Sequence, residues 1–293
     1  TKTLVIGASG FVGCYLVREL ENAGHVVVQA NFPEFNLLDK ESVERLVETE
    51  KPANVINLAA VSSVGASWAN PVETVEVNVR GTLHLLDAVQ KFAPKAKVLL
   101  IGSAEEYAPK STPLSESDAL SASSPYGISK IAQENFADLY RKKHGLKIIC
   151  TRSFNHTGVG QTTSFALPSF VKQVADIQKT GKPGVIKVGN LEALRDFSDV
   201  RDVVHAYRML VESENQFNVY NVGSGKAYKV GDLLNSIVSL ATVKIDIEKD
   251  PERVRPVEVP FQCADNSRIK ELGYWNATDI HETLKWMFDS EMK

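Results

Sequence analysis

Cysteine is scarce in this sequence of 293 residues, and its pattern argues against two kinds of site. The three cysteines, Cys14, Cys150 and Cys263, are odd in number and widely spaced, which argues against a disulfide framework and favours a reducing compartment. None lies near a second cysteine or a paired histidine, so we expect no metal site. The sequence also lacks an apolar run of the roughly 18 residues that a membrane span needs, and no charged-then-apolar leader opens it. We therefore expect a cytoplasmic protein without a membrane partner.

An excess of charge of one sign is lacking too. The net charge is −3 and the signs are interspersed, so we expect no nucleic-acid partner. Hydrophobic residues make up 43% of the chain, which is enough for one large α/β unit or two domains. The chain therefore has enough apolar material to fold without disulfides or a structural metal.

The first glycines of the sequence follow a short apolar run. Leu4-Val5-Ile6 predicts a strand, and Gly7-x-x-Gly10-x-x-Gly13 then opens an amphipathic helix to about Ala23. Glycines let the backbone approach a pyrophosphate, and a helix N-terminus supplies N–H groups and a favourable dipole. The order of strand, glycine loop and helix favours a dinucleotide site over glycines that serve packing alone. The residues of this site would be Gly7, Gly10, Phe11, Val12 and Gly13.

Two later stretches extend the expected cofactor site. The second strand, residues 26–28, leads into Gln29-Ala30-Asn31, so no charged residue there selects NAD or NADP. We expect Asn36 and Leu37 to meet the adenine at the start of a helix that runs to about Glu50, although Asp39 as its N-cap is an equal alternative. The next strand ends in small residues that let the backbone lie close to a nicotinamide ribose, and it contributes Leu58, Ala59 and Ala60.

A tyrosine and a lysine stand four residues apart in Ser124-Pro125-Tyr126-Gly127-Ile128-Ser129-Lys130, at the start of a predicted helix to about Lys143. Residues four apart share a helix face, and an ammonium near a phenol favours the phenolate. We therefore expect Lys130 to lower the pKa of Tyr126 and to make it a usable acid or base. The same spacing also occurs by chance on amphipathic helices.

Ser103 follows a strand at residues 98–101, and catalytic groups tend to lie beyond the carboxyl ends of such strands. Its hydroxyl could hold a substrate oxygen beside Tyr126, or it could merely cap a turn. A polar loop at residues 62–68 and a long helix at residues 71–92 precede it. Asn78 in that helix is as readily a packing residue as a support for the site.

Strands and helices alternate up to about Thr151, which predicts an α/β fold with a parallel, doubly wound, Rossmann-like sheet. After Arg152 the predicted elements are shorter and less regular. We therefore expect a dinucleotide-binding domain at residues 1–155 and a smaller substrate-binding lobe at residues 156–293, interleaved with the first domain.

In this order, the glycine motif, Asn57-Leu58-Ala59-Ala60, Ser103 and Tyr126-x-x-x-Lys130 resemble the extended short-chain dehydrogenase/reductases, the NAD-dependent epimerase/dehydratase family, which act on nucleotide sugars. The resemblance covers nearly the whole chain. It implies that Tyr126 is the general acid/base, that Lys130 binds the nicotinamide ribose and lowers the tyrosine pKa, and that Ser103 orients the reacting sugar oxygen. It also implies NADP or NAD as cofactor.

Three stretches of the second half, residues 152–161, 188–197 and 253–258, resemble the GDP-mannose branch of that family. This branch contains GDP-mannose 4,6-dehydratases and GDP-4-keto-6-deoxy-mannose reductases. Guanidinium forks grip a diphosphate well, although Arg195 beside Asp196 could also be an ordinary ion pair. The resemblance implies a GDP-sugar substrate held by Asn155, Asn190, Arg195, Arg255 and Glu258.

The segment Ser103-Ala104-Glu105 bears on the reaction. A dehydratase needs a base beside its tyrosine; Ala104 removes one polar group there, and Glu105 keeps a possible base. The surrounding segments look more like the reductase, so the resemblance implies reduction of the 4-keto group of GDP-4-keto-6-deoxy-D-mannose by NAD(P)H to give GDP-D-rhamnose. The alternatives are a GDP-mannose 4,6-dehydratase, another nucleotide-sugar epimerase, and a non-catalytic dinucleotide-binding regulator. In the family the helices at 71–92 and 126–143 pair between subunits, which implies a homodimer.

Overall fold

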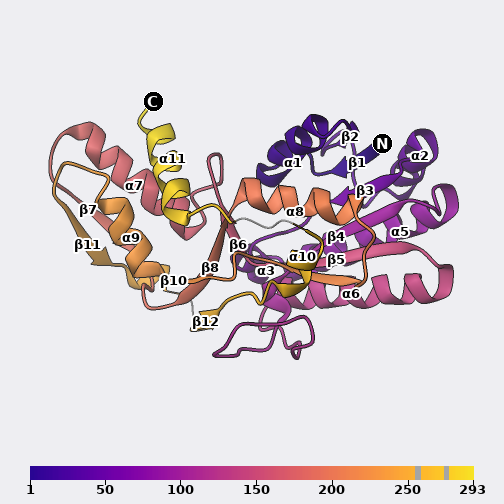
Figure 1. Cartoon of the computed structure of the whole chain (residues 1–293). Helices are drawn as coiled ribbons and strands as arrows, with labels where there is room; N and C mark the ends of the chain where they lie inside the picture. The colour runs from indigo at the N-terminus through magenta and orange to yellow at the C-terminus, as the bar shows by residue number, and fades with distance from the viewer. Residues whose placement is uncertain (255–258, 274–276) are drawn as a thin grey trace.

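A six-stranded parallel sheet forms the centre of the protein, as expected (Figure 1). The computed structural model describes residues 1–254, 259–273 and 277–293. Parallel strands that are buried on both faces are apolar almost throughout, which matches the strand sequences here. In sheet order the strands are β2 (Val26–Ala30), β1 (Lys2–Ile6), β3 (Asn54–Asn57), β4 (Lys97–Ser103), β5 (Lys147–Ser153) and β9 (Val219–Val222).

Helices cover both faces of this sheet (Figure 1). Successive strand side chains point to opposite faces, so Leu4 and Ile6 join one core cluster and Val5 joins the other. The first cluster lies under α2 (Lys40–Glu50), α5 (Gly81–Phe92) and α6 (Pro125–His144), and the second lies under α1 (Phe11–Asn22) and α8 (Val200–Glu212). The doubly wound prediction is therefore confirmed.

Three local predictions differ from the structure. The stretch expected as a loop contains a short helix, α3 (Val64–Ala69), because the Ser63 hydroxyl caps it by accepting a hydrogen bond from Ala66 N–H at 3.0 Å. The helix expected from Asn36 begins only at Lys40, since the Asp39 side chain is its N-cap. The long helix at residues 71–92 is interrupted: α4 (Pro71–Val75) passes through a π-helical turn, Glu76–Arg80, before α5.

Asn78 explains the π-helical turn. Its amide Nδ2 donates to Val61 O at 3.0 Å and to Ser129 Oγ at 2.9 Å, and its Oδ1 accepts from Val61 N–H at 2.8 Å. The buried amide therefore joins the segment after β3 to α6. Such turns recur at functional sites.

A smaller lobe lies at the end of the molecule opposite the N-terminus (Figure 1). It has its own hydrophobic core, and the chain returns from it to the main sheet through α8 and β9. No helix of the described ranges 1–254, 259–273 and 277–293 is long and apolar enough to cross a membrane. The remaining elements are β6 (Asn155–Thr157), α7 (Ala166–Thr180), β7 (Gly184–Val188), β8 (Leu194–Asp199), β10 (Ala227–Lys229), α9 (Val230–Val238), β11 (Ile245–Lys249), β12 (Phe261–Gln262), α10 (Ser267–Glu271) and α11 (Ile280–Glu291), with short 3₁₀ turns at Ala104–Glu106 and Pro251–Arg253.

The end of β4 has no room for a side chain at Gly102. A Cβ there would lie 2.3 Å from Thr151 O and 2.5 Å from Glu106 Oε1. We predict that Gly102→Ala lowers the free energy of unfolding by about 1–3 kcal/mol, measured by urea denaturation. The control is Gly65→Ala in α3, where the nearest atom is 3.8 Å away. Equal stability of the two variants would contradict this reading of the β4–β5 contact.

Candidate active site

The glycine loop between β1 and α1 fits a dinucleotide pyrophosphate. Gly7 has a φ of +81°, which favours glycine, and a Cβ at Gly13 would lie 2.4 Å from Gly7 O. The N-cap of α1 is Gly10, which has no side chain to occupy the N–H groups of the first turn. The N-terminus of α1, at Phe11 and Val12, can therefore present N–H groups to the phosphates of NAD(P).

The carboxyl ends of the neighbouring strands meet this loop. A Cβ on Gly7 would lie 3.0 Å from Ala59 N, so the segment after β3 passes close to the loop. Leu58 N–H donates to Ile6 O at 2.9 Å, and Asn57 Oδ1 accepts from Ala59 N–H at 3.1 Å. The structure thus brings the predicted residues Leu58, Ala59 and Ala60 beside the glycine motif.

Asn36 and Leu37 lie in the turn before α2. Leu37 is only 5% exposed and packs in the core, where its side chain would contact a Cβ placed on Gly81 of α5. Asn36 Oδ1 accepts from Leu38 N–H at 2.9 Å and closes the turn. Leu37 is thus mainly a core residue, and a contact of either residue with adenine stays a prediction.

The start of α6 carries the tyrosine and the lysine to the end of β4. The Ser124 hydroxyl caps the helix by accepting from Gly127 N–H at 3.1 Å. Lys130 is buried, and its Nζ donates to Ile101 O at 2.7 Å and lies 5.8 Å from the centre of the Tyr126 ring. Ser103 hydrogen-bonds the Tyr126 side chain. Three of the four predicted catalytic residues, Ser103, Tyr126 and Lys130, therefore come together.

Ser103 also has the capping role that the sequence left open. Its hydroxyl accepts from Glu105 N–H at 3.2 Å and begins the 3₁₀ turn Ala104–Glu106. The turn fixes the hydroxyl next to Tyr126. The capping interpretation of Ser103 is confirmed, and a bond of its hydroxyl to a substrate oxygen stays a prediction.

The expected lowering of the Tyr126 pKa was wrong for this structure. Burial raises the pKa of Tyr126, and the hydrogen bond with Ser103 offsets only part of that effect. Burial also lowers the pKa of Lys130 to about 8. The exclusion of solvent disfavours the charged phenolate of Tyr126 and the charged ammonium of Lys130 alike. The phenol is therefore held neutral and is suited to donating a proton.

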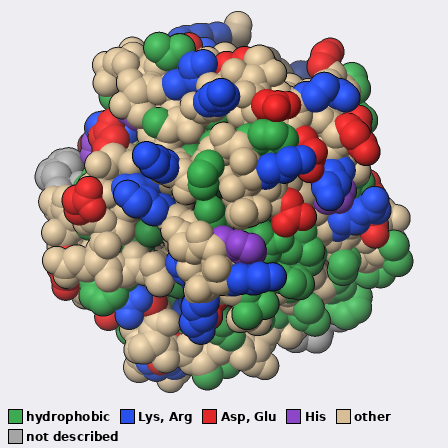
Figure 2. Space-filling model, turned by 90° about the vertical axis from the view of Figure 1, so that its right-hand side faces the viewer, with side chains coloured by type: hydrophobic (Ala, Val, Ile, Leu, Met, Phe, Trp, Pro, Cys, Tyr) green, Lys and Arg blue, Asp and Glu red, His purple; other side chains and the backbone are tan. Residues whose placement is uncertain are grey.

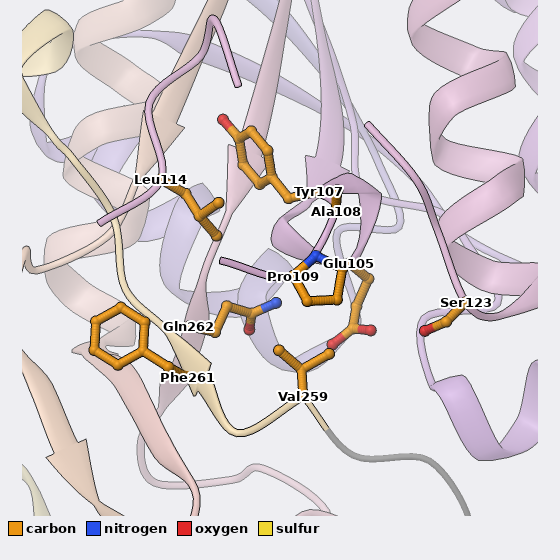
Figure 3. Close-up of a pocket in the computed structure, with 9 residues that line it drawn as sticks. All are labelled: Glu105, Tyr107, Ala108, Pro109, Leu114, Ser123, Val259, Phe261 and Gln262. Carbon is orange, nitrogen blue, oxygen red and sulfur yellow. The ribbon is translucent and has the colours of Figure 1, made fainter. Parts of the chain in front are cut away.

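Glu105 faces a pocket shared by both halves of the chain. Figure 3 shows its carboxyl and the Ser123 hydroxyl directed into the same space, with Phe261 and Gln262 on the other side. Gln262 Nε2 donates to Ala104 O at 3.3 Å, which ties β12 to the Ser103 turn. A carboxylate is thus available next to the catalytic turn.

The structure describes three of the five residues predicted to hold the nucleotide sugar. Asn155 begins β6, opposite Phe197 of β8, while Asn190 Oδ1 accepts from Glu192 N–H at 2.9 Å. Arg195 lies in β8, and its Nη1 donates to Leu194 O at 2.9 Å. Arg255 and Glu258 lie outside the described residues.

Asp196 bonds to backbone groups that lie far from it in the sequence. Its fully buried carboxylate accepts from the N–H groups of Ser224, Gly225 and Ala264 at 2.9–3.0 Å. It therefore joins β8 to the segments that follow β9 and β12. An ion pair between Arg195 and Asp196 stays a prediction.

Sequence reasoning missed two polar residues beside the catalytic group. Gln133 Nε2 donates to Ile101 O at 3.1 Å, the same carbonyl that Lys130 uses. Glu106 Oε1 accepts from Ser103 N–H at 2.9 Å. Both had a signal in the sequence, since Gln133 stands three residues after Lys130 on the same helix face, and Ser103-x-x-Glu106 is the capping-box spacing.

Comparisons with known proteins agree with this geometry. A family model described as GDP-mannose 4,6 dehydratase matches residues 25–287. GDP-6-deoxy-D-mannose reductase of Pseudomonas aeruginosa is 31% identical over 94% of this chain and 91% of its own. GDP-6-deoxy-D-talose 4-dehydrogenase of Aggregatibacter actinomycetemcomitans is 28% identical over 99% of this chain and 98% of its own. The solved structure of RMD from Pseudomonas aeruginosa complexed with NADPH has a TM-score of 0.91 and 29% identity, covering 100% of this chain and 99% of that one.

The match covers most of the chain and includes the second half, from which the sugar-binding residues are predicted. The structure places the glycine loop, the Ser103 turn and the Tyr126–Lys130 pair at the carboxyl ends of the central strands. The chain therefore belongs to the GDP-mannose 4,6-dehydratase family of the extended short-chain dehydrogenase/reductases.

Proposed function

We propose that this NAD(P)-dependent enzyme reduces the 4-keto group of GDP-4-keto-6-deoxy-D-mannose to give GDP-D-rhamnose. The observation that carries the proposal is the position of the Tyr126 phenol, near Ser103 and Lys130 at the sheet edge that holds the glycine loop. Ketone reduction needs a proton donor at that point. The relationship to a GDP-6-deoxy-D-mannose reductase supports the choice of substrate.

The chain's own residues supply the proton and position the ketone. NAD(P)H, when bound, supplies the hydride. Ser103 holds the ketone oxygen, and Tyr126 donates its proton to that oxygen as negative charge develops on it. Lys130, anchored on Ile101 O, favours the resulting phenolate.

Residues 156–293 form the nucleotide-sugar lobe in this proposal. Asn155, Asn190 and Arg195 hold the GDP-sugar, together with Arg255 and Glu258. Arginine suits this role because its guanidinium can pair with a diphosphate through two hydrogen bonds. We also place the enzyme in the cytoplasm, in keeping with its free thiols.

Asn31 makes NADPH the preferred cofactor. At the carboxyl end of β2, its Oδ1 accepts from Ser9 N–H at 2.7 Å. A backbone N–H can bond only the amide oxygen, so the amide is oriented with its NH₂ group as the remaining donor. A neutral donor tolerates a ribose 2′-phosphate, whereas an acidic residue here binds the 2′-hydroxyl of NAD.

A homodimer accounts for the exposed apolar face of α3, α4 and α6. Hydrophobic side chains gather on one side of the face shown in Figure 2. The three helices pack against one another and expose large hydrophobic residues, which is typical of a protein interface. These residues are Trp68, Val72, Val75, Ile128 and Leu139.

A dehydratase is the second candidate because Glu105 lines the pocket beside Ser103. Elimination needs a base at the carbon next to the ketone, and this carboxylate could act as one. Such an enzyme turns over GDP-mannose without added reductant.

The reaction is tested with purified protein, GDP-4-keto-6-deoxy-mannose and NADPH or NADH. We predict cofactor oxidation and a sugar product reduced at carbon four. Tyr126→Phe should lower kcat by about 10²–10⁴-fold because the proton donor is lost. The matched control, Tyr140→Phe, removes a hydroxyl that bonds Asp87 on α5 and should leave kcat unchanged.

No cofactor oxidation with either nucleotide would refute the reductase. Turnover of GDP-mannose alone, lost in Glu105→Gln, would establish the dehydratase instead.

Cofactor choice is tested at Asn31. We predict that the wild-type enzyme has the higher kcat/KM with NADPH, and that Asn31→Asp shifts the ratio toward NADH by about 10–100-fold, because a carboxylate repels the 2′-phosphate. Asn31→Ala removes the hydrogen bond to Ser9 without adding a charge. It should lower kcat/KM with NADPH and with NADH without reversing the preference. A wild-type preference for NADH contradicts the assignment.

The oligomeric state is tested by light scattering after gel filtration. We predict a dimer for the wild-type protein and a monomer for Leu139→Asp, since a charge on the apolar face of α6 would be buried in the interface. Val185→Asp, an equally exposed position on β7, should stay dimeric. A wild-type monomer, or a dimer of Leu139→Asp, argues against this interface.

A further inference from the structure

Glu106 is a buried carboxyl group that the proposed reaction does not use. It is fully buried at the end of the turn that Ser103 begins. Its Oε1 accepts from Ser103 N–H at 2.9 Å and lies where a side chain on Gly102 would be. Glu106 therefore fixes the backbone of the residue whose hydroxyl meets Tyr126.

The second oxygen of Glu106, Oε2, has no hydrogen-bond partner within the described part of the chain. Arg152 Nε is 3.9 Å from it, too far for a hydrogen bond. The guanidinium is already used: Nε and Nη2 donate to Glu134 at 3.0 and 2.6 Å, and Nη1 donates to Glu116 O at 3.0 Å. An ionised Glu106 would thus bury a carboxylate oxygen without a donor, which is costly.

The charges around Glu106 favour its neutral form. Burial, and after it the nearby Glu134 carboxylate, raise the pKa of Glu106 to about 8, while Arg152 and the Ser103 N–H act in the opposite direction. Among the described residues, the turn packs mainly against α6 and β5, and Gln262 of β12, which does not titrate, reaches Ala104 O. Their titratable groups near Glu106 are Tyr126, Lys130 and Glu134 on α6 and Cys150 and Arg152 on β5, with Glu105 and Tyr107 adjacent in sequence.

We propose that Glu106 is a positioning residue for ketone reduction. As a neutral carboxylic acid it accepts from Ser103 N–H and donates its proton toward Glu134, and this holds the Ser103 turn beside Tyr126. The proposal rests on the proposed function.

Loss of the proton to water at alkaline pH weakens the site in two ways. The ionised carboxylate repels Glu134 and loses the fixed hydrogen-bond pattern. It also raises the pKa of Tyr126 further, so the phenol becomes a weaker proton donor. The pKa of Lys130 is also about 8, so the comparison with Glu106→Gln separates the Glu106 contribution to the alkaline limit of activity from loss of the Lys130 proton.

The kinetic test compares the wild type with Glu106→Gln, an amide that mimics the neutral acid at every pH. Its oxygen can accept from Ser103 N–H and its NH₂ can donate to Glu134. With the ketosugar and NADPH, we expect the two kcat/KM values to agree within about threefold near pH 7. Above about pH 8 the wild-type value should fall roughly tenfold per unit, and in Glu106→Gln this fall should begin at least about one unit higher.

Two further variants separate positioning from general damage. Glu106→Val removes the acceptor of Ser103 N–H, so kcat should fall at least about tenfold at every pH. Glu44→Gln on α2, whose glutamate pairs with Lys91, should keep the wild-type profile. An unchanged alkaline limb in Glu106→Gln overturns the proposal.

Unfolding gives a test that needs no substrate. A carboxyl whose pKa is raised in the folded protein stabilises it below its unfolded pKa, and this contribution is lost as pH rises through the folded pKa. As the pH rises from about 5 to about 9, the Tm of the wild type should therefore fall relative to that of Glu106→Gln. If the difference is the same at both values, Glu106 is ionised throughout and the proposal is wrong. Failure of the proposed reaction would instead appear as a wild-type protein that does not reduce the ketosugar.

Discussion

The carbonyl of Ile101, two residues before the end of β4, accepts hydrogen bonds from two side chains of α6. Lys130 and Gln133 both reach it, so the helix is fixed in one register along the strand. This register decides that Tyr126, one turn earlier on α6, stands beside Ser103 at the end of β4. Asn78, in the π-helical turn, also holds α6. Its amide donates to Ser129, which lies between Tyr126 and Lys130. The position of the predicted catalytic residues on α6 thus depends on one strand carbonyl and its donors.

A strand from the second half of the chain, β9, holds the segment that follows Ser103. Asn221 of β9 accepts from the Tyr107 hydroxyl at 2.6 Å, donates to Leu114 O at 2.7 Å, and its N–H reaches Glu116 at 2.8 Å. The segment after Ser103 is therefore clamped onto a strand that is more than a hundred residues away in sequence. The pocket at Glu105 and the Ser103 turn share this support, because β9 is a strand of the main sheet.

Much of this could be predicted because its cause is local. Alternating strands and helices, the glycine loop, and the spacing of Tyr126 and Lys130 each follow from short-range rules, and the sheet and catalytic trio agree with them. The failures concern tertiary burial. The Tyr126 pKa rises because neighbouring elements remove solvent. Leu37 lies in the core because α5 packs over it, and its predicted contact with adenine stays a prediction. The π-helical turn requires a partner, Val61, that the spacing of residues 71–92 does not reveal.

The π-helical turn also sets the orientation of α4 against α5. An α-helix advances about 100° per residue, and a π-helical turn accommodates one residue more than an α-helical turn in the same length. Removal of one residue between Glu76 and Arg80 would rotate α4 by about that angle about the helix axis and turn Val72 and Val75 away from the direction they now face. The same turn that lets Asn78 reach the catalytic helix thus determines which way the exposed apolar surface points. A change in length at this place would alter the junction with α6 and the exposed apolar surface together.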